Sequence, residues 1–192
     1  MSSVVISGDT SGSITLQAPA VSGSTTLTLP ALTGTVLTNK TAGTVLQVVN
    51  FQTGAVATGT TSIPRDNTIP QITEGNEYMS LAITPTNVNN KLKIDVVFNY
   101  AHDNGTNNAV QLALFQDSTS NALAAVQDQI NTDHFSQLVL IHYMTAGTVS
   151  ATTFKVRAGA NSTGTLTFNG QQGSRFMGGV MASSITITEI TA

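Results

Sequence analysis

Apolar and polar side chains alternate along residues 91–100, which read KLKIDVVFNY. The apolar side chains of one face are Leu92, Ile94, Val96, Phe98 and Tyr100. The other face is polar except for Val97. A period of two is typical of a strand with one buried face. We therefore predict a central strand of an antiparallel sheet in this segment.

Further segments rich in β-branched and aromatic residues, separated by turn-forming residues, predict the remaining strands. They are Val45–Phe51, Tyr78–Ile83, Val110–Gln116, Gln137–Met144, Thr153–Ala158, Thr165–Phe168 and Val180–Ile190. Asn104-Gly105 and Asn169-Gly170 give the clearest turn signals, because Asn and Gly tolerate a positive φ. Ala122–Ile130 is the one segment for which we predict helical turns. The pattern indicates an all-β protein, an antiparallel β-sandwich.

The segment 138–144 is apolar on both faces. Leu138, Leu140 and Met144 share one face, and the intervening positions are also apolar apart from His142. One face must pack in the core, and exposed apolar patches of this size are typical of protein interfaces. We therefore predict that the other face contacts another copy of the chain. The predicted interface residues are Val97, Val139, Ile141 and Tyr143.

The first part of the chain has a different pattern. GSITLQAPAVS at residues 12–22 repeats as GSTTLTLPALT at residues 23–33, and aromatic residues are absent. Each copy alternates apolar residues with Thr and ends at a Pro, which cannot continue a strand ladder. We place the boundary near Ala42, which gives an extended N-terminal arm at 1–42 and a sandwich domain at 43–192.

Two strand-like repeats are too few to bury a core of their own. The arm therefore needs a partner: it pairs with the arms of symmetry-related copies or adds a strand to a neighbouring protein. A disordered tail is the alternative, since the arm is poor in apolar residues. For the bound arm, the predicted contact residues are Ile14, Leu16, Leu27, Leu29, Val36 and Leu37.

Composition narrows the classes of function. Only 9% of the residues are charged, against about 25% in an average soluble protein. The net charge is −3 with seven Lys and Arg, so no basic stripe is available to neutralise phosphates and we expect no nucleic-acid partner. The absence of cysteine excludes disulfides, thiolate nucleophiles and Cys-ligated zinc. No apolar run of about 18 residues and no secretory signal pattern occur, so we expect synthesis in the cytoplasm and no membrane contact.

Residues able to carry chemistry are few. His102 and His134 each stand beside an Asp, but adjacent residues on an extended chain point apart. His142 lies on the Leu140 face of its strand, which indicates a core or interface role. No G-x-S-x-G, H-E-x-x-H, phosphate-binding loop or EF-hand spacing is present. We predict no catalytic, metal-binding or cofactor-binding residues, and a protein that is not an enzyme.

Several segments together resemble a known family. They are Gly43–Val49, Leu81–Pro85, Asn89–Ile94, Ser150–Val156, Gly164–Asn169 and Ser184–Ile190. In this order they are similar to a β-sandwich module of tailed-bacteriophage structural proteins, common in phages of cyanobacteria and marine bacteria. The repeated Gly-Ser-x-Thr-Leu-x-x-Pro-Ala of the arm resembles a segment in the N-terminal parts of phage fibre and virion proteins. The resemblance implies a jelly roll similar to the C1q and tumour-necrosis-factor type, assembled as a trimer on the virion surface.

This resemblance leads to three hypotheses. The first is a homotrimeric capsid decoration protein, also called a cement or head-fibre protein, whose arm binds the major capsid protein or another virion protein. The second is a short tail fibre or receptor-binding tip that recognises a host surface glycan, although the chain is short for a tail fibre and has no coiled coil or long shaft. The third is a soluble bacterial C1q-like or lectin-like protein. The loop Thr61–Glu77 and the segment His102–Asn108 are the candidate contact regions for a host surface or a neighbouring subunit.

Overall fold

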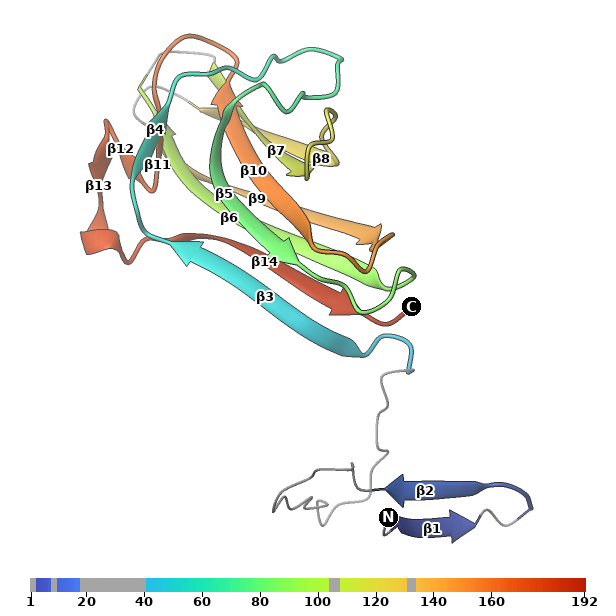
Figure 1. The fold of residues 1–192 in the computed structure, drawn as a ribbon. Helices are drawn as coiled ribbons and strands as arrows, with labels where there is room; N and C mark the ends of the chain where they lie inside the picture. Colours follow the sequence, from blue (N-terminus) through green and yellow to red (C-terminus); the bar gives the residue numbers. More distant parts are fainter. Residues whose placement is uncertain (1–2, 8–9, 18–40, 104–107, 131–133) are drawn as a thin grey trace. The chain divides into compact units, whose positions relative to one another are not determined.

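The structure, a computed structural model, describes residues 3–7, 10–17, 41–103, 108–130 and 134–192. The chain divides into two compact units, Met1–Val36 and Leu37–Ala192. The described part of the first unit is an antiparallel hairpin of β1 (Ser3–Ser7) and β2 (Ser13–Gln17), with Ile6 opposite Ile14. The second unit holds the remaining strands (Figure 1).

The second unit is a sandwich of two antiparallel sheets (Figure 1). The four-stranded sheet runs, in spatial order, β5 (Asn76–Ile83), β10 (Thr152–Ala160), β7 (Asn108–Gln116) and β8 (Ala124–Ile130). The long strands of the other sheet are β9 (Phe135–Thr145), β6 (Lys91–His102), β14 (Ser183–Ile190) and β3 (Val45–Thr53). Because consecutive strands mostly cross from one sheet to the other, the chain forms a jelly roll.

Short elements complete the second sheet at one end. β11 (Leu166–Phe168) pairs with the C-terminal part of β6 and with β4 (Ala57–Gly59). β12 (Gly170–Gln171) and β13 (Ser174–Arg175) form a small hairpin, followed by the 3₁₀ turn η1 (Met177–Gly179). Asn169 joins β11 to β12 with a φ of 53°, the positive φ that its Asn-Gly sequence predicts.

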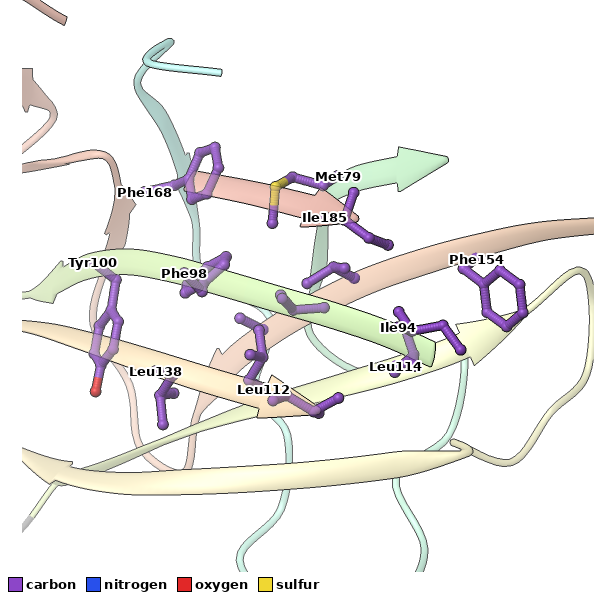
Figure 2. Packing of buried hydrophobic residues seen from close by; sticks show 14 of the residues in the cluster. Met79, Ile94, Phe98, Tyr100, Leu112, Leu114, Leu138, Phe154, Phe168 and Ile185 are labelled. Carbon is purple, nitrogen blue, oxygen red and sulfur yellow. The ribbon is translucent and has the colours of Figure 1, made fainter. Parts of the chain in front are cut away.

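The core lies between the two sheets (Figure 2). The alternation of residues 91–100 is confirmed, because all five apolar side chains of that face are fully buried. Four aromatic rings gather at one end of the core, where Phe98 lies 5.4 Å from Tyr78, 5.9 Å from Tyr100 and 5.0 Å from Phe168 between ring centroids. Tyr100 reaches across the sandwich from β6, and its hydroxyl donates to the Asp128 carboxylate of β8 at 3.1 Å. Ser136 of β9 donates to the same carboxylate, so three strands of the two sheets are joined there.

The predicted strands all overlap observed strands, with two corrections. Ala122–Ile130 is not helical: Ala124–Ile130 forms β8, because residues 124–130 pair with β7 and place Ala124 and Val126 against the core. Tertiary pairing thus overrides the helix propensity of Ala and Gln. The last strand begins at Ser183 rather than Val180, because the positive φ values of Met177, Gly178 and Gly179 form a turn before it.

The end of the sheet near the C-terminus is closed by polar contacts. Glu189 is fully buried, and its carboxylate accepts hydrogen bonds from Gln47 at 2.6 Å, Asn90 at 2.6 Å and both the amide and hydroxyl of Thr86 at 2.8 Å. Beside it, Thr191 exchanges backbone hydrogen bonds with the segment 43–44 and donates its hydroxyl to the Thr41 carbonyl oxygen. The chain is therefore fixed to the sandwich from Thr41 onward.

Candidate assembly surface

The outer face of the sheet β9–β6–β14–β3 is built from residues in defined rows. The registers place Tyr143 of β9 opposite Lys93 of β6, then Thr188 of β14 and Val48 of β3. The next row is Ile141, Asp95, Thr186 and Asn50, and the third is Val139, Val97, Ser184 and Gln52. We call this surface the open face. It follows directly from the period of two on each strand.

Three large apolar side chains line the β9 side of the open face. Val139, Ile141 and Tyr143 are 50%, 56% and 60% exposed, while Leu138 and Leu140 of the same strand are buried in the core. We call these three residues the β9 stripe. Val97 lies beside the stripe and is half-buried. The outward side chains of this strand therefore lie outside the core of the single chain, and their use as a trimer interface stays a prediction.

The middle of the open face carries charged side chains. Lys93 and Asp95 form an ion pair with 2.7 Å between Nζ and Oδ1. Hydrogen bonding to Asp95 raises the pKa of Lys93 above its ordinary value. Lys91 donates to the Thr145 hydroxyl at 2.7 Å, so the charged side chains of β6 find partners within the chain.

The outer face of the four-stranded sheet differs, because the chain itself covers it. The segment 60–75 between β4 and β5 places Ile63 on Phe115 and Ala113 of β7, and all three are buried. Arg157 of β10 donates to the carbonyl oxygens of Glu74 at 2.9 Å and Gly75 at 2.7 Å. The loop that we expected to be a contact region is thus anchored to the protein's own sheet through Ile63, Ile72 and Gly75, while its residues 64–69 are exposed.

The predicted contact residues of the arm lie partly within the described structure. Ile14 is 66% exposed, opposite Ile6 at 54%, and Leu16 lies in β2 opposite Val4. Leu27, Leu29, Val36 and Leu37 lie outside the described residues. A two-stranded hairpin is at best marginally stable alone in water. The Ile6–Ile14 pair is therefore an exposed aliphatic surface on the hairpin, and its contact with another protein stays a prediction.

The structure places the three histidines in different surroundings. His102 is buried and its Nδ1 lies 2.9 Å from Nδ2 of Asn108, whereas Asp103 is exposed and accepts a hydrogen bond from the Thr165 amide at 2.7 Å. His134 is exposed, and its neighbour Asp133 lies outside the described residues, as do 104–107 of the second expected contact region. His142 is half-buried on the inner side of β9, where desolvation lowers its pKa.

The described residues form surface hollows. One is lined by Asp117, Met144 and Thr152 among others, but the Asp117 carboxylate already accepts hydrogen bonds from the Thr152 hydroxyl at 2.9 Å and the Thr153 amide at 2.7 Å. Within the described residues, no group of three or more His, Asp and Glu side chains is placed to hold a metal ion. In the same part of the chain, no helix has the length and apolar character to cross a membrane.

One part of the open face was not predicted from the sequence. Val45 and Val48 of β3 are 54% and 55% exposed at the sheet edge opposite β9. Their segment, VLQVVNFQT, shows no simple alternation, and a bulge shifts the register between Glu189 and Ile190. Only the pairing with β14 assigns Val45 and Val48 to the open face, so no sequence signal identified them.

Comparisons with known proteins give a likeness of fold. No protein-family model matches the chain, and no curated protein matches it in sequence. The structure of Eiger TNF from S. frugiperda is similar with a TM-score of 0.42 and 7% identity, over 75% of this chain and 93% of that one. That of infectious bursal disease virus Gx strain has a TM-score of 0.37 and 10% identity, over 76% of this chain and 37% of that one. The enzymatically active domain of bacteriophage CBA120 tailspike protein 4 has a TM-score of 0.24 and 16% identity, over 63% of this chain and 18% of that one. All three TM-scores lie below 0.5, so these likenesses carry no conclusion about function.

Proposed function

We propose that this chain is a non-catalytic virion surface protein that assembles as a homotrimer and decorates the capsid through its N-terminal arm. The observation that carries the proposal is the β9 stripe, three large apolar side chains that are at least half exposed in the single chain. Removing apolar surface from water contributes about 25 cal/mol per Å², so covering the stripe with a second copy favours assembly. The resemblance of the sequence to phage structural modules supports the location on a virion.

The division of the chain into two units supports two separate contacts. The sandwich provides the β9 stripe for self-association, while the hairpin β1–β2 is a distinct unit with its own exposed aliphatic pair. Strand addition by such an arm to the major capsid protein or to another virion protein would satisfy its unpaired backbone groups. The proposal includes no cofactor, no metal and no nucleic acid.

The self-association is tested by the mass of the full chain in solution. We expect a trimer by multi-angle light scattering for the wild-type chain, and dissociation for Ile141→Glu, because a carboxylate in a covered apolar contact is costly to desolvate. Val149→Glu is the matched control, since Val149 is also 54% exposed but lies in the β9–β10 connection. A monodisperse wild-type monomer at micromolar concentration would refute the trimer.

The arm's role is tested by deletion. A variant lacking residues 1–40 keeps Thr41 and its contact with Thr191. We expect this variant to remain trimeric and to lose binding to particles that lack the protein. Retained binding would contradict the role of the arm.

A reconstruction of the particle would locate the protein and give its copy number. A few trimers at the tail would favour the receptor-binding alternative over capsid decoration.

A further inference from the structure

The open face carries a second apolar stripe at its other edge. Val45 and Val48 of β3, which we call the β3 stripe, lie in the same rows as Thr145 and Tyr143 but across the full width of the sheet. Both are more than half exposed. Between the two stripes lie the ion pair Lys93–Asp95 and the hydroxyl groups of β14. The large exposed apolar side chains therefore stand at the two edges of the face, and the middle carries these polar groups together with the partly buried Val97 and Ile190.

This distribution is the reverse of the usual arrangement at sheet edges. Edge strands are normally protected from pairing by Lys, other charged residues or Pro. β3 (VLQVVNFQT) and β9 (FSQLVLIHYMT) contain no Lys, Arg, Asp, Glu or Pro. Among the described residues, β3 pairs only with β14 and β9 pairs only with β6, so both are edges. The charges Lys91, Lys93 and Asp95 lie instead on the interior strand β6.

A closed ring of three copies needs two different surfaces on each subunit. Each copy contacts the next head-to-tail, so the surface offered on one side meets a different surface on the other. The two stripes at opposite edges of one face meet this requirement. Each strand is antiparallel to its neighbour across β9–β6–β14–β3, so β9 and β3 run in opposite directions. In a ring whose axis follows the strands, β9 of one copy is then antiparallel to β3 of the next, a direction in which edge strands can approach and pair.

We infer that the β9 stripe of one copy packs on the β3 stripe of the next copy, with the middle of each open face turned toward the three-fold axis. The inference rests on the trimer proposed above and names the surface that the β9 stripe contacts. Three sheets then form the walls of a triangular prism, and each corner is a β9–β3 contact. The Lys93–Asp95 pair needs no partner from another copy, because its charges already compensate each other at 2.7 Å.

Cysteine cross-linking tests this contact cleanly, because the natural chain contains no cysteine. The variants are Ile141→Cys, Val48→Cys and the double variant, each as the full chain and treated with a short bis-maleimide reagent. In the double variant we expect covalent dimers and trimers on a denaturing gel, because the thiol introduced on β9 of one copy meets the thiol introduced on β3 of the next. Neither single variant should cross-link, and an equal mixture of the two after subunit exchange should give dimers only.

The control is Ile141→Cys combined with Val149→Cys, which keeps two exposed thiols but places one outside both stripes. Circular dichroism checks that each variant is folded, and light scattering checks that it is still a trimer. Dimers from Ile141→Cys alone would mean that the β9 stripe meets itself, which overturns the inference. A wild-type trimer without cross-linking in the double variant also overturns it while leaving the proposed assembly intact. A wild-type monomer overturns both.

Discussion

The two sheets of the sandwich differ in what covers their outer faces. On β7, the outward side chains Ala113 and Phe115 lie beneath Ile63 of the chain's own 60–75 segment. On β9, the outward side chains Ile141 and Tyr143 have no cover from the described part of the chain and are more than half exposed. Both strands are apolar on two faces, so their sequences alone give the same expectation for each.

The difference shows how a doubly apolar strand can be accommodated. One solution is internal, since a connection long enough to fold back supplies the missing layer. Residues 60–75 do this, and Gly159 on β10 allows it because a Cβ there would collide with the Thr61 carbonyl oxygen. The other solution is external and leaves the surface to a second molecule. Our predictions test this contrast through the free energy of unfolding, from the largest expected change to the smallest.

The first prediction concerns the covered face. Ile63→Ala should lower the free energy of unfolding by about 2–5 kcal/mol, because it leaves a cavity over Phe115 and loosens the covering segment. Ile69→Ala in the same segment is the control, since Ile69 is 54% exposed and its loss should cost less than about 0.5 kcal/mol. Urea unfolding measures the free energy of unfolding of each variant. Equal losses in the two variants would show that the segment is not a cover.

The second prediction concerns the polar closure of the open-face sheet. Burial raises the pKa of Glu189, but the hydrogen bonds from Asn90, Gln47 and Thr86 outweigh burial and leave the pKa below its ordinary value. A lowered pKa in the folded state adds stability above the unfolded-state pKa, and this stability is lost as the pH falls through the folded pKa. Stability should therefore decline in acid below about pH 4.5.

Glu189→Gln should remove much of that acid dependence and cost about 1–3 kcal/mol at neutral pH, because four donors lose a charged acceptor. Urea midpoints at pH 7 and pH 3.5 for the variant and the wild type measure both effects. Glu77→Gln is the control, since the Glu77 carboxylate lies at the surface 3.5 Å from Arg157 and contributes little. If Glu189→Gln loses as much stability between pH 7 and pH 3.5 as the wild type does, Glu189 is not the source of the acid sensitivity.

The third prediction concerns the side of the sandwich where β8 meets β9. Tyr100→Phe removes the hydrogen bond to Asp128 and should cost about 0.5–1.5 kcal/mol. Tyr143→Phe removes a hydroxyl from the open face and should be close to neutral, because Tyr143 is 60% exposed. The comparison uses the same chemical change at a buried and at an exposed tyrosine. Identical thermal midpoints for the two variants would contradict a stabilising role for the Tyr100–Asp128 contact.

The smallest expected change in the stability of the single chain is at the β9 stripe. Ile141→Ser should alter the free energy of unfolding of the monomer by less than about 0.5 kcal/mol, since the side chain is 56% exposed. The same variant should weaken the trimer strongly. Unfolding measured at several protein concentrations separates the two effects, because a trimer becomes more stable as concentration rises. A large loss that is independent of concentration would place Ile141 in the chain's own core.

The alternation on residues 91–100 was enough to predict β6, and enrichment in β-branched and aromatic residues between turn signals located the other long strands apart from β8. Every one of these predictions used local sequence pattern. It failed at Ala122–Ile130, where the run of Ala and Gln favours a helix locally and only pairing with β7 makes a strand. Local pattern also did not predict that the outer face of β7 is covered and that of β9 is exposed. The residues that cover a strand come from another segment of the chain, so the strand's own sequence does not identify them. The β3 stripe was missed for a related reason: a bulge between Glu189 and Ile190 sets which β3 residues face outward.

The sequence by itself determined the all-β class, most strand positions and the apolar excess on β9, because a period of two and turn residues are local properties of the chain. The tertiary structure alone decided which apolar faces are covered. Ile63 reaches Phe115 from a segment much earlier in the chain, and Val48 joins the row of Tyr143 through two intervening strands. Coverage is a relation between distant segments, so it exists only once the sheets have formed.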